Sequence, residues 1–204
     1  MKAKLIGIIG LDGSGKTTLT ASLYNWCQQQ GLKTTSIHFW PSLPALPSFS
    51  KSSSSGTKSA GLSKLPGWKA FGLFVIVRWM QYWALPRLSR KYDVILCDRY
   101  LYDLVTYFEL RGHPKLAQKL LQSPAVADVV FWLQADPEEL QKRKSFEHSL
   151  SVYQGWFKLY QNLNQQLAAA NVQLNPLDAH QPQQAVFERA CCILKEQQIV
   201  KTTP

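Results

Sequence analysis

The sequence predicts an α/β fold with three layers, in which helices cover both faces of a five-stranded parallel sheet. Short apolar runs alternate with longer helical segments along the 204 residues, which is the pattern of strands joined by crossover helices. A glycine-rich turn also follows the first apolar run and precedes the first helical segment. Hydrophobic residues make up 46% of the chain and charged residues 18%, so the chain can form a sizeable core. Its length predicts one domain over residues 1–204.

The expected strands are compact runs rich in β-branched and other apolar residues. Strands of a parallel sheet are buried on both faces and therefore read as nearly continuous apolar runs. The clearest are YDVILC, at residues 92–97, and ADVVFWL, at residues 127–133. The five predicted strands cover residues 4–9, 34–40, 92–97, 127–133 and 172–174.

The expected helices have recognisable ends. Gly31 follows the first helix at a position that favours glycine, and Pro137 opens a later helix in its first turn, where its missing N–H costs nothing. The run Gly112-His113-Pro114 is predicted to end the third helix. The predicted helices cover residues 16–30, 67–90, 101–111 and 115–122, a segment that begins at residue 137, and residues 150–170 and 183–197.

Residues 41–67 interrupt this alternation. Four prolines and the run KSSSSGTK lie there, and such a segment cannot bury enough apolar surface to offset the cost of ordering it. We therefore expect a flexible loop, placed after the second strand, where a cap over a substrate could be inserted.

The net charge of +10 favours acidic partners, which include nucleic acid, anionic lipid and phosphorylated small molecules. A solvated basic surface is the simpler alternative. The most apolar stretch, residues 71–88, carries Arg78 at its centre and is too short to span a bilayer, so we expect a buried helix and no membrane partner. The four cysteines show no metal-ligand spacing and are predicted to be reduced thiols of a cytoplasmic protein.

The strongest functional signal is the turn at residues 10–17, Gly-Leu-Asp-Gly-Ser-Gly-Lys-Thr. Gly10 is followed after four residues by Gly15, Lys16 and Thr17. Glycines let several backbone N–H groups approach phosphate oxygens, the lysine can reach the β- and γ-phosphates, and the threonine hydroxyl can bind Mg²⁺. The turn therefore predicts a P-loop NTPase fold that binds a nucleoside triphosphate with Mg²⁺, most simply ATP.

The second signal is Asp98-Arg99-Tyr100, directly after a buried strand. A carboxylate at the carboxyl end of a strand beside the loop can hold Mg²⁺, and an adjacent arginine suits a two-pronged grip on a phosphate. The alternative is a salt bridge at the end of the strand. Next to a phosphate loop, these residues favour phosphoryl transfer over binding alone.

With these motifs the chain resembles the thymidylate kinase-like branch of the nucleoside monophosphate kinases. The loop GLDGSGKTT, including Asp12, and Asp98-Arg99-Tyr100 have the form of the family's two main motifs. Weaker matches are Phe74 with Arg78 and Trp79, the segment 135–144 that leads into a lid at about residues 142–152, and the late turn at residues 177–179.

The resemblance implies roles for single residues. Asp12, Asp98, Arg99 and Lys16 would be catalytic, and Thr17 and Asp98 would act on the metal. The ATP-binding set would be Gly10, Asp12, Gly13, Ser14, Gly15, Lys16, Thr17, Thr18 and Arg143. The acceptor would meet Asp12, Phe74, Arg78, Arg99 and Tyr107. Core packing is the alternative for Phe74 and Tyr107, and a solvated basic run is the alternative for Arg143.

The implied partner is a small phosphate acceptor, expected to be a nucleotide, and the resemblance also implies a homodimer. We expect no nucleic-acid partner. The chain departs from the family on the acceptor side, with Tyr102-Asp103-Leu104 after the second motif and a short lid poor in arginine. The acceptor is therefore open. The alternatives are a P-loop kinase of a nucleoside or another small metabolite, and a non-catalytic ATP-binding module.

Overall fold

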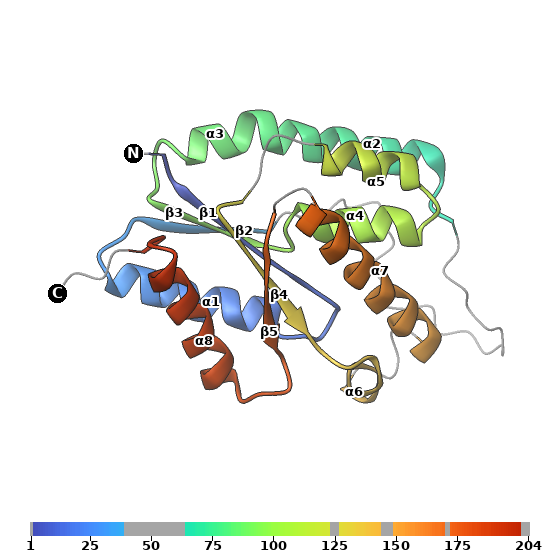
Figure 1. Cartoon of the computed structure of the whole chain (residues 1–204). Helices are drawn as coiled ribbons and strands as arrows, with labels where there is room; N and C mark the ends of the chain where they lie inside the picture. Colours follow the sequence, from blue (N-terminus) through green and yellow to red (C-terminus); the bar gives the residue numbers. More distant parts are fainter. Residues whose placement is uncertain (1, 39–63, 123–126, 144–148, 170–171, 201–204) are drawn as a thin grey trace, which may run out of the picture.

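Five parallel strands form the central sheet, in the order β2-β3-β1-β4-β5 (Figure 1). The computed structural model describes residues 2–38, 64–122, 127–143, 149–169 and 172–200. The strands are β1 (Lys4–Gly10), β2 (Thr34–His38), β3 (Val94–Asp98), β4 (Val129–Gln134) and β5 (Leu174–Asp178). The predicted fold class and the number of strands are confirmed.

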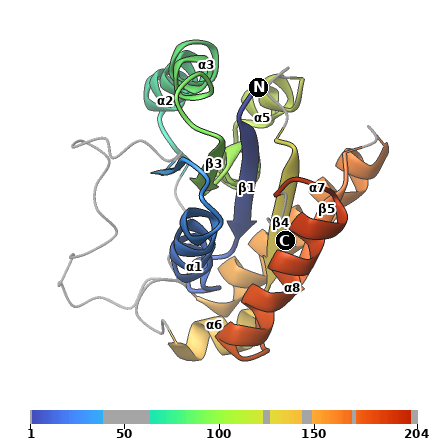
Figure 2. The ribbon, with the colours of Figure 1, turned by 90° about the vertical axis from the view of Figure 1, so that its left-hand side faces the viewer.

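Helices cover both faces of this sheet (Figures 1 and 2). They are α1 (Lys16–Gln29), α2 (Gly67–Trp79), the π-helical turn η1 (Met80–Ala84), α3 (Leu85–Leu88), α4 (Leu101–Leu110), α5 (Pro114–Leu121), α6 (Pro137–Arg143), α7 (Leu150–Ala169) and α8 (Gln183–Glu196). Helices α1 and α8 lie on one face, and α2, α4, α5 and α7 lie on the other. The fold therefore has the three predicted layers.

Each face of the sheet has its own hydrophobic core because successive side chains of a strand point to opposite faces. Ile6 and Ile8 of β1 belong to the core under α1 and α8, with Leu23 and Leu194. Ile9, next along the strand, belongs to the core on the other face. Leu73, Leu104 and Tyr160 contribute to that second core from α2, α4 and α7. The central strand is thus buried on both sides, which explains its apolar sequence.

The parallel register brings the carboxyl ends of the strands to one edge of the sheet. Asp98 of β3 pairs with Ile8 of β1 and with His38 of β2, and Gly10 pairs with Leu133 of β4. Ligands of open parallel sheets bind at this edge, where loops leave neighbouring strands. The glycine-rich turn and Asp98 therefore share one site.

The last strand lies further along the chain than predicted. It covers Leu174–Asp178 instead of residues 172–174, and the predicted late turn at 177–179 includes its end. Pro176 breaks the apolar pattern, but the proline is tolerated because β5 is an edge strand that pairs only with β4 in the sheet order.

Two helix boundaries also differ. The helix predicted over residues 67–90 contains the π-helical turn η1 and ends at Leu88, with Pro86 in its last segment. Pro114, predicted as part of a helix stop, instead opens α5 as its first residue, a position that suits proline. These differences leave the arrangement of the layers unchanged.

Two predicted loops fall mainly outside the described residues. Of the flexible loop at 41–67, only residues 64–67 are described, and Gly67 begins α2. The lid predicted at about 142–152 lies at the junction of α6 and α7, and its centre, residues 144–148, is outside the described part. Within the ranges that the structure describes, no helix is both long and apolar enough to cross a bilayer.

We expect Gly7→Ala to destabilise the fold. A Cβ at Gly7 would lie 2.8 Å from Cγ of Tyr100, which is fully buried and has no room to move. Overpacking of this kind costs about 1–3 kcal/mol of the free energy of unfolding, which urea denaturation measures. Gly155→Ala is the control, because apart from the nearby backbone of its own helix and its chain neighbours no described atom lies within 4 Å of a Cβ there, and alanine favours the helix. Equal urea midpoints for wild type and Gly7→Ala would contradict the expectation.

Candidate active site

The glycine-rich turn joins β1 to α1 and needs its glycines for conformational reasons. Gly10, Gly13 and Gly15 have φ values of 146°, 88° and 96°, in the region that other residues rarely adopt. A Cβ at Gly10 would also lie 2.8 Å from the carbonyl oxygen of Leu133. The hydroxyl of Ser14 is buried and has no hydrogen-bond partner among the described residues. The turn therefore provides a close backbone cradle with a polar group left to satisfy, which fits a bound phosphate chain.

The ammonium of Lys16 is buried inside this turn. Its Nζ donates to the carbonyl oxygens of Gly10, at 2.8 Å, and Leu11, at 2.7 Å. A carboxylate oxygen of Asp12 lies 3.7 Å away. Burial lowers the pKa of Lys16, and the negative charge of Asp103 is the strongest effect that opposes this shift. The lysine is thus held at the loop, where phosphate oxygens could replace its carbonyl partners.

Thr17 and Asp98 form an oxygen-rich pair at the start of α1. The Thr17 hydroxyl donates to Oδ2 of Asp98 at 2.8 Å, and Nδ1 of His38 lies 3.6 Å from the same oxygen. Burial alone would raise the pKa of Asp98, but hydrogen bonds from His38 and Thr17 bring it below its ordinary value. The other oxygen, Oδ1, is buried without a partner among the described residues. A carboxylate with a free oxygen beside a hydroxyl suits Mg²⁺, which prefers oxygen ligands.

Arg99 reaches across the turn to Asp12. It adopts a φ of 57°, unusual for a residue other than glycine, at the turn between β3 and α4. Its guanidinium forms a salt bridge with Oδ1 of Asp12. Burial alone would lower the pKa of Arg99, but the carboxylates of Asp12 and Asp103 raise it above its ordinary value. The arginine therefore stays charged beside the phosphate loop.

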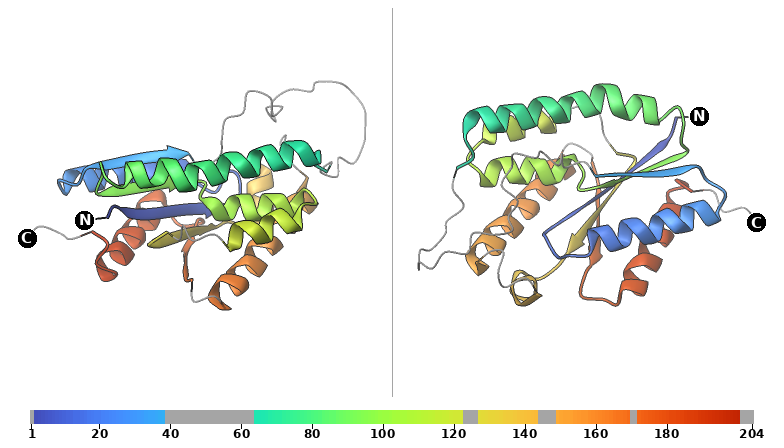
Figure 3. Two further views of the ribbon diagram at one scale, coloured as in Figure 1. Left: turned by 90° about the horizontal axis from the view of Figure 1, so that it is seen from above. Right: turned by 180° about the vertical axis from the view of Figure 1, so that it is seen from behind.

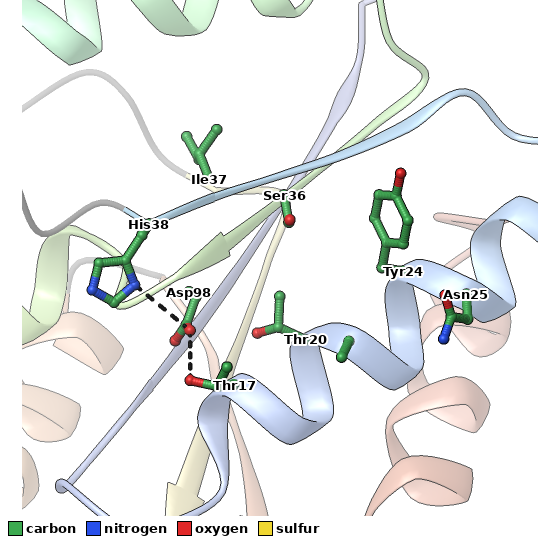
Figure 4. Close-up of a pocket in the computed structure, with 9 residues that line it drawn as sticks. Thr17, Thr20, Tyr24, Asn25, Ser36, Ile37, His38 and Asp98 are labelled. Atoms are coloured by element: carbon green, nitrogen blue, oxygen red, sulfur yellow. Dashed lines mark hydrogen bonds and ion pairs between the residues drawn. The ribbon is translucent and has the colours of Figure 1, made fainter.

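A cavity of about 280 Å³ lies beside this site, between α1 and β2 (Figure 4). Thr17 and Asp98 line one end of it, and Thr20 and Tyr24 line the side formed by α1. In Figure 4 His38 points towards Asp98, so the end of β2 contributes to the same end of the cavity as the Thr17–Asp98 pair. The part played by His38 is an addition to the residues that the motifs indicated.

A second group that sequence motifs missed lies behind the turn. Asp103 of α4 is completely buried and accepts hydrogen bonds from the Gly10 N–H and the Tyr160 hydroxyl. The signal in the sequence was a carboxylate within the apolar run LYDLVTYF, because a buried charge needs partners. Its partner Tyr160 is 57 residues away in the chain, so the sequence could not identify it.

The other predicted residues lie on different elements. Phe74 and Arg78 lie together on α2, with Cζ of Arg78 6.0 Å from the ring centre of Phe74. Arg78 also contacts its own helical segment, donating to the Tyr82 hydroxyl at 2.6 Å. Tyr107 is buried in α4, and Arg143 at the end of α6 pairs with Glu139 at 3.3 Å. The structure thus brings together the loop residues with Asp98 and Arg99, whereas these four contact other parts of the fold.

The comparison with known families agrees with this arrangement. The chain matches the model described as thymidylate kinase over residues 8–190, a range that includes the loop, Asp98, Arg99 and every helix through α7. A search of curated proteins found no match. The matched range covers most of the 204 residues and includes both the glycine-rich turn and Asp98, which the structure brings together. The chain therefore belongs to the thymidylate kinase family, a family of nucleotide kinases.

Proposed function

We propose that the protein transfers the γ-phosphoryl group of ATP to a nucleoside monophosphate, with Mg²⁺ as cofactor. The observation that carries the proposal is the placement of Arg99, held by Asp12, beside the Thr17–Asp98 pair. A phosphate loop alone would support nucleotide binding. A charged arginine directed at the same loop also supports a second phosphate group, because guanidinium groups bind phosphates through two parallel hydrogen bonds.

On the ATP side, the chain's own groups position and neutralise the phosphate chain. The backbone N–H groups of residues 13–16 and the N-terminus of α1 would bind phosphate oxygens, and the Lys16 ammonium would exchange its carbonyl partners for them. Gly13, Ser14, Gly15 and Thr18, whose side chain is exposed, would belong to this ATP-binding set. Thr17 and Asp98 would hold Mg²⁺, which would supply positive charge to neutralise the charge that develops during transfer. Arg143 would approach the adenine or the lid.

On the acceptor side, Arg99 would bind the acceptor phosphate and keep it in line with the ATP γ-phosphate. Its salt bridge with Asp12 fixes the guanidinium before the acceptor arrives, which reduces the entropy lost on binding. Phe74 would stack on the base, Arg78 would hydrogen-bond to it, and Tyr107 would contact the sugar. For Arg78 this role requires that the guanidinium leave Tyr82, to which it now donates.

A coupled assay of ADP release tests the proposal. Purified protein with ATP and Mg²⁺ is given each nucleoside monophosphate in turn, and then nucleosides that lack the phosphate. ADP release with at least one monophosphate, and its loss in Lys16→Ala, is the expected result. Release only with nucleosides would favour the alternative kinase, and no release with any acceptor would reject the proposed transfer.

We also propose that the enzyme is a homodimer that works in the cytoplasm, where its thiols would stay reduced. An exposed aromatic face on α2 and η1 supports the dimer. Among the described residues, the exposed large hydrophobic side chains are Trp68, Phe71, Val75, Trp79, Tyr82 and Trp83. Their spacing places them on one side of the helix, and Trp68 is 74% exposed.

This aromatic face lies on the outside of the molecule. Seen from above, the long rod of α2, η1 and α3 runs along the edge of the helical layer, with no described ribbon over it (Figure 3, left). A contiguous apolar patch of this kind marks an interaction surface, and two copies related by a twofold axis can bury it against each other. A second copy is the simplest partner because the face is apolar along the length of α2.

Thr17→Val should impair metal-dependent ATP binding. Valine keeps the shape of threonine but lacks the hydroxyl that lies 2.8 Å from Asp98. Losing an interaction with a charged group costs about 1.5–3 kcal/mol, or roughly 10- to 100-fold in affinity. Calorimetric titration of ATP with and without Mg²⁺ measures the effect, and Thr17→Ser, which keeps the hydroxyl, is the control. An unchanged gain from Mg²⁺ in Thr17→Val would remove this residue from the metal site.

Arg99→Ala should weaken use of the acceptor more than use of ATP. The variant loses the proposed phosphate clamp, so the KM of the monophosphate should rise by roughly 10- to 100-fold. Initial rates with each substrate varied in turn separate the two constants. Arg99→Lys keeps the charge but not the paired donors and should be intermediate. Equal rises in both KM values would argue against an acceptor role.

Trp79→Glu should convert the dimer into a monomer. The indole is 60% exposed at the centre of the aromatic face, and a carboxylate there would place like charges together across a twofold axis. Size-exclusion chromatography with light scattering measures the mass. Cys192→Glu adds the same charge at an exposed position of α8 and should leave the mass unchanged. A monomeric wild type would rule out the proposed dimer.

A further inference from the structure

A carboxyl group lies buried directly behind the phosphate loop. Asp103 is 0% exposed, and α4 is buried from Leu101 to Phe108. Burying an isolated carboxylate is strongly unfavourable, so hydrogen bonds and opposite charges must stabilise Asp103. None of the roles proposed above for ATP, Mg²⁺ or the acceptor uses this residue.

The hydrogen bonds of Asp103 connect three elements at the start of the loop. Its Oδ1 accepts from the Gly10 N–H at 3.2 Å and from the Tyr160 hydroxyl of α7 at 2.6 Å. The Tyr160 hydroxyl also lies 3.2 Å from the Gly10 carbonyl oxygen, the same oxygen that accepts from Lys16. Its Oδ2 is buried and has no hydrogen-bond partner among the described residues. Both backbone groups of Gly10 are therefore held by a contact that involves Asp103 or Tyr160.

Asp103 and Lys16 carry opposite charges that act on each other. The charged groups that act on it are Lys16 of α1 and Arg99 before α4, and from α7 it faces Tyr160. Burial raises the pKa of Asp103 to about 6, although Lys16 and Arg99 both oppose the shift. Reciprocally, Asp103 is the carboxylate that most strongly opposes the lowering of the Lys16 pKa by burial. Lys16 and Asp103 therefore act on each other as opposite charges, and each favours the charged form of the other.

We propose that Asp103 is a positioning residue of the phosphate loop, which holds Gly10 together with Tyr160 and serves as the countercharge of Lys16 until ATP phosphates take over that role. This inference rests on the proposed binding of ATP to the loop. When phosphates reach Lys16, their negative charge disfavours the nearby carboxylate. Asp103 then binds a proton from solvent in a larger fraction of the molecules.

Protonation also suits the local hydrogen bonds. A neutral Asp103 can donate to the Tyr160 oxygen, and the Tyr160 hydrogen can then turn to the Gly10 carbonyl oxygen 3.2 Å away. That carbonyl keeps a donor when Lys16 leaves it for phosphate. Because the protonated form of Asp103 binds ATP better, affinity for ATP must increase as the pH falls through the range just above 6.

Isothermal titration of Mg²⁺ and ATP into the full-length protein tests this coupling. Titrations at pH 6.5, 7.25 and 8, in buffers of different ionisation enthalpy, give both affinity and proton uptake. Wild type should take up a net fraction of a proton. If ATP raises the pKa of Asp103 by one unit from about 6, wild type should bind ATP about threefold more tightly at pH 6.5 than at pH 8.

Asp103→Asn keeps an oxygen acceptor for Gly10 and Tyr160 but cannot titrate. The change of its affinity between pH 6.5 and pH 8 should be about threefold smaller than that of wild type, and its proton uptake should fall. Titrating groups on which Asp103 does not act are common to both proteins and cancel in the difference. Tyr160→Phe keeps the carboxylate and should retain the pH dependence while binding ATP more weakly at every pH.

The outcomes separate this inference from the proposed function. A wild type that binds no ATP would overturn the function itself. A wild type that binds ATP without proton uptake, or an Asp103→Asn variant with the pH dependence of wild type, would overturn the inference alone. If Asp103→Asn does not fold, as judged by circular dichroism, the wild-type proton uptake still decides the question.

Discussion

The burial of the Lys16 ammonium is the constraint on which the site depends. A buried charge must be solvated by the protein, and the Gly10 and Leu11 carbonyl groups do this at 2.8 and 2.7 Å. These carbonyls can point inward only because the turn follows the unusual backbone path of Gly10, Gly13 and Gly15. The path in turn requires β1 to be central, so that Gly10 meets Leu133 of the neighbouring strand. The position of Lys16 thus depends on the conformation of the loop, and the loop depends on the place of β1 in the sheet.

Lys16 belongs to a group of charged side chains whose interactions nucleotide binding would change. Arg99 adds a second cation, and Asp12, Asp98 and Asp103 add three carboxylates that act on the lysine. Each carboxylate has its own position: Asp12 binds Arg99, Asp98 binds Thr17, and Asp103 lies behind the loop. Two cations and three anions leave an excess of negative charge, which a divalent cation would offset. The three carboxylates oppose the effect of Arg99, whose positive charge lowers the pKa of Lys16.

The helical layer over the other face of the sheet has two separate tasks. Leu73 and Val77 of α2 pack into the core, which explains why this helix is so apolar in sequence. The opposite side of the same helix exposes Phe71 and Trp79, which the core does not explain. An apolar helix with two apolar sides is therefore ambiguous in sequence, since one side can face the core and the other a partner. The prediction of a buried helix was correct only for the side of α2 that faces the core.

Features formed by residues close together in the sequence could be predicted, whereas features that depend on residues far apart in the chain could not. Within the loop, glycine spacing reports a backbone conformation directly, and Asp98-Arg99 follows a recognisable strand. The sequence therefore indicated that these residues lie close together, and the structure has them in contact through Thr17 and Asp12. The edge strand β5 was misplaced because Pro176 disrupts its pattern and only the sheet shows that an edge tolerates proline. Arg78 was assigned a role from its unusual position in an apolar helix, yet its observed partner, Tyr82, lies one turn away.

The sequence by itself therefore determined the α/β/α fold and the phosphate loop with its lysine, threonine and following aspartate, because these features are encoded in neighbouring residues. Only the tertiary structure decided the surroundings of that loop. The His38 contact with Asp98 depends on the pairing of β2 with β3, and the contact of Asp103 with Tyr160 depends on the packing of α4 against α7. Such contacts arise from the relative placement of distant segments, which packing of the cores sets and local patterns do not record.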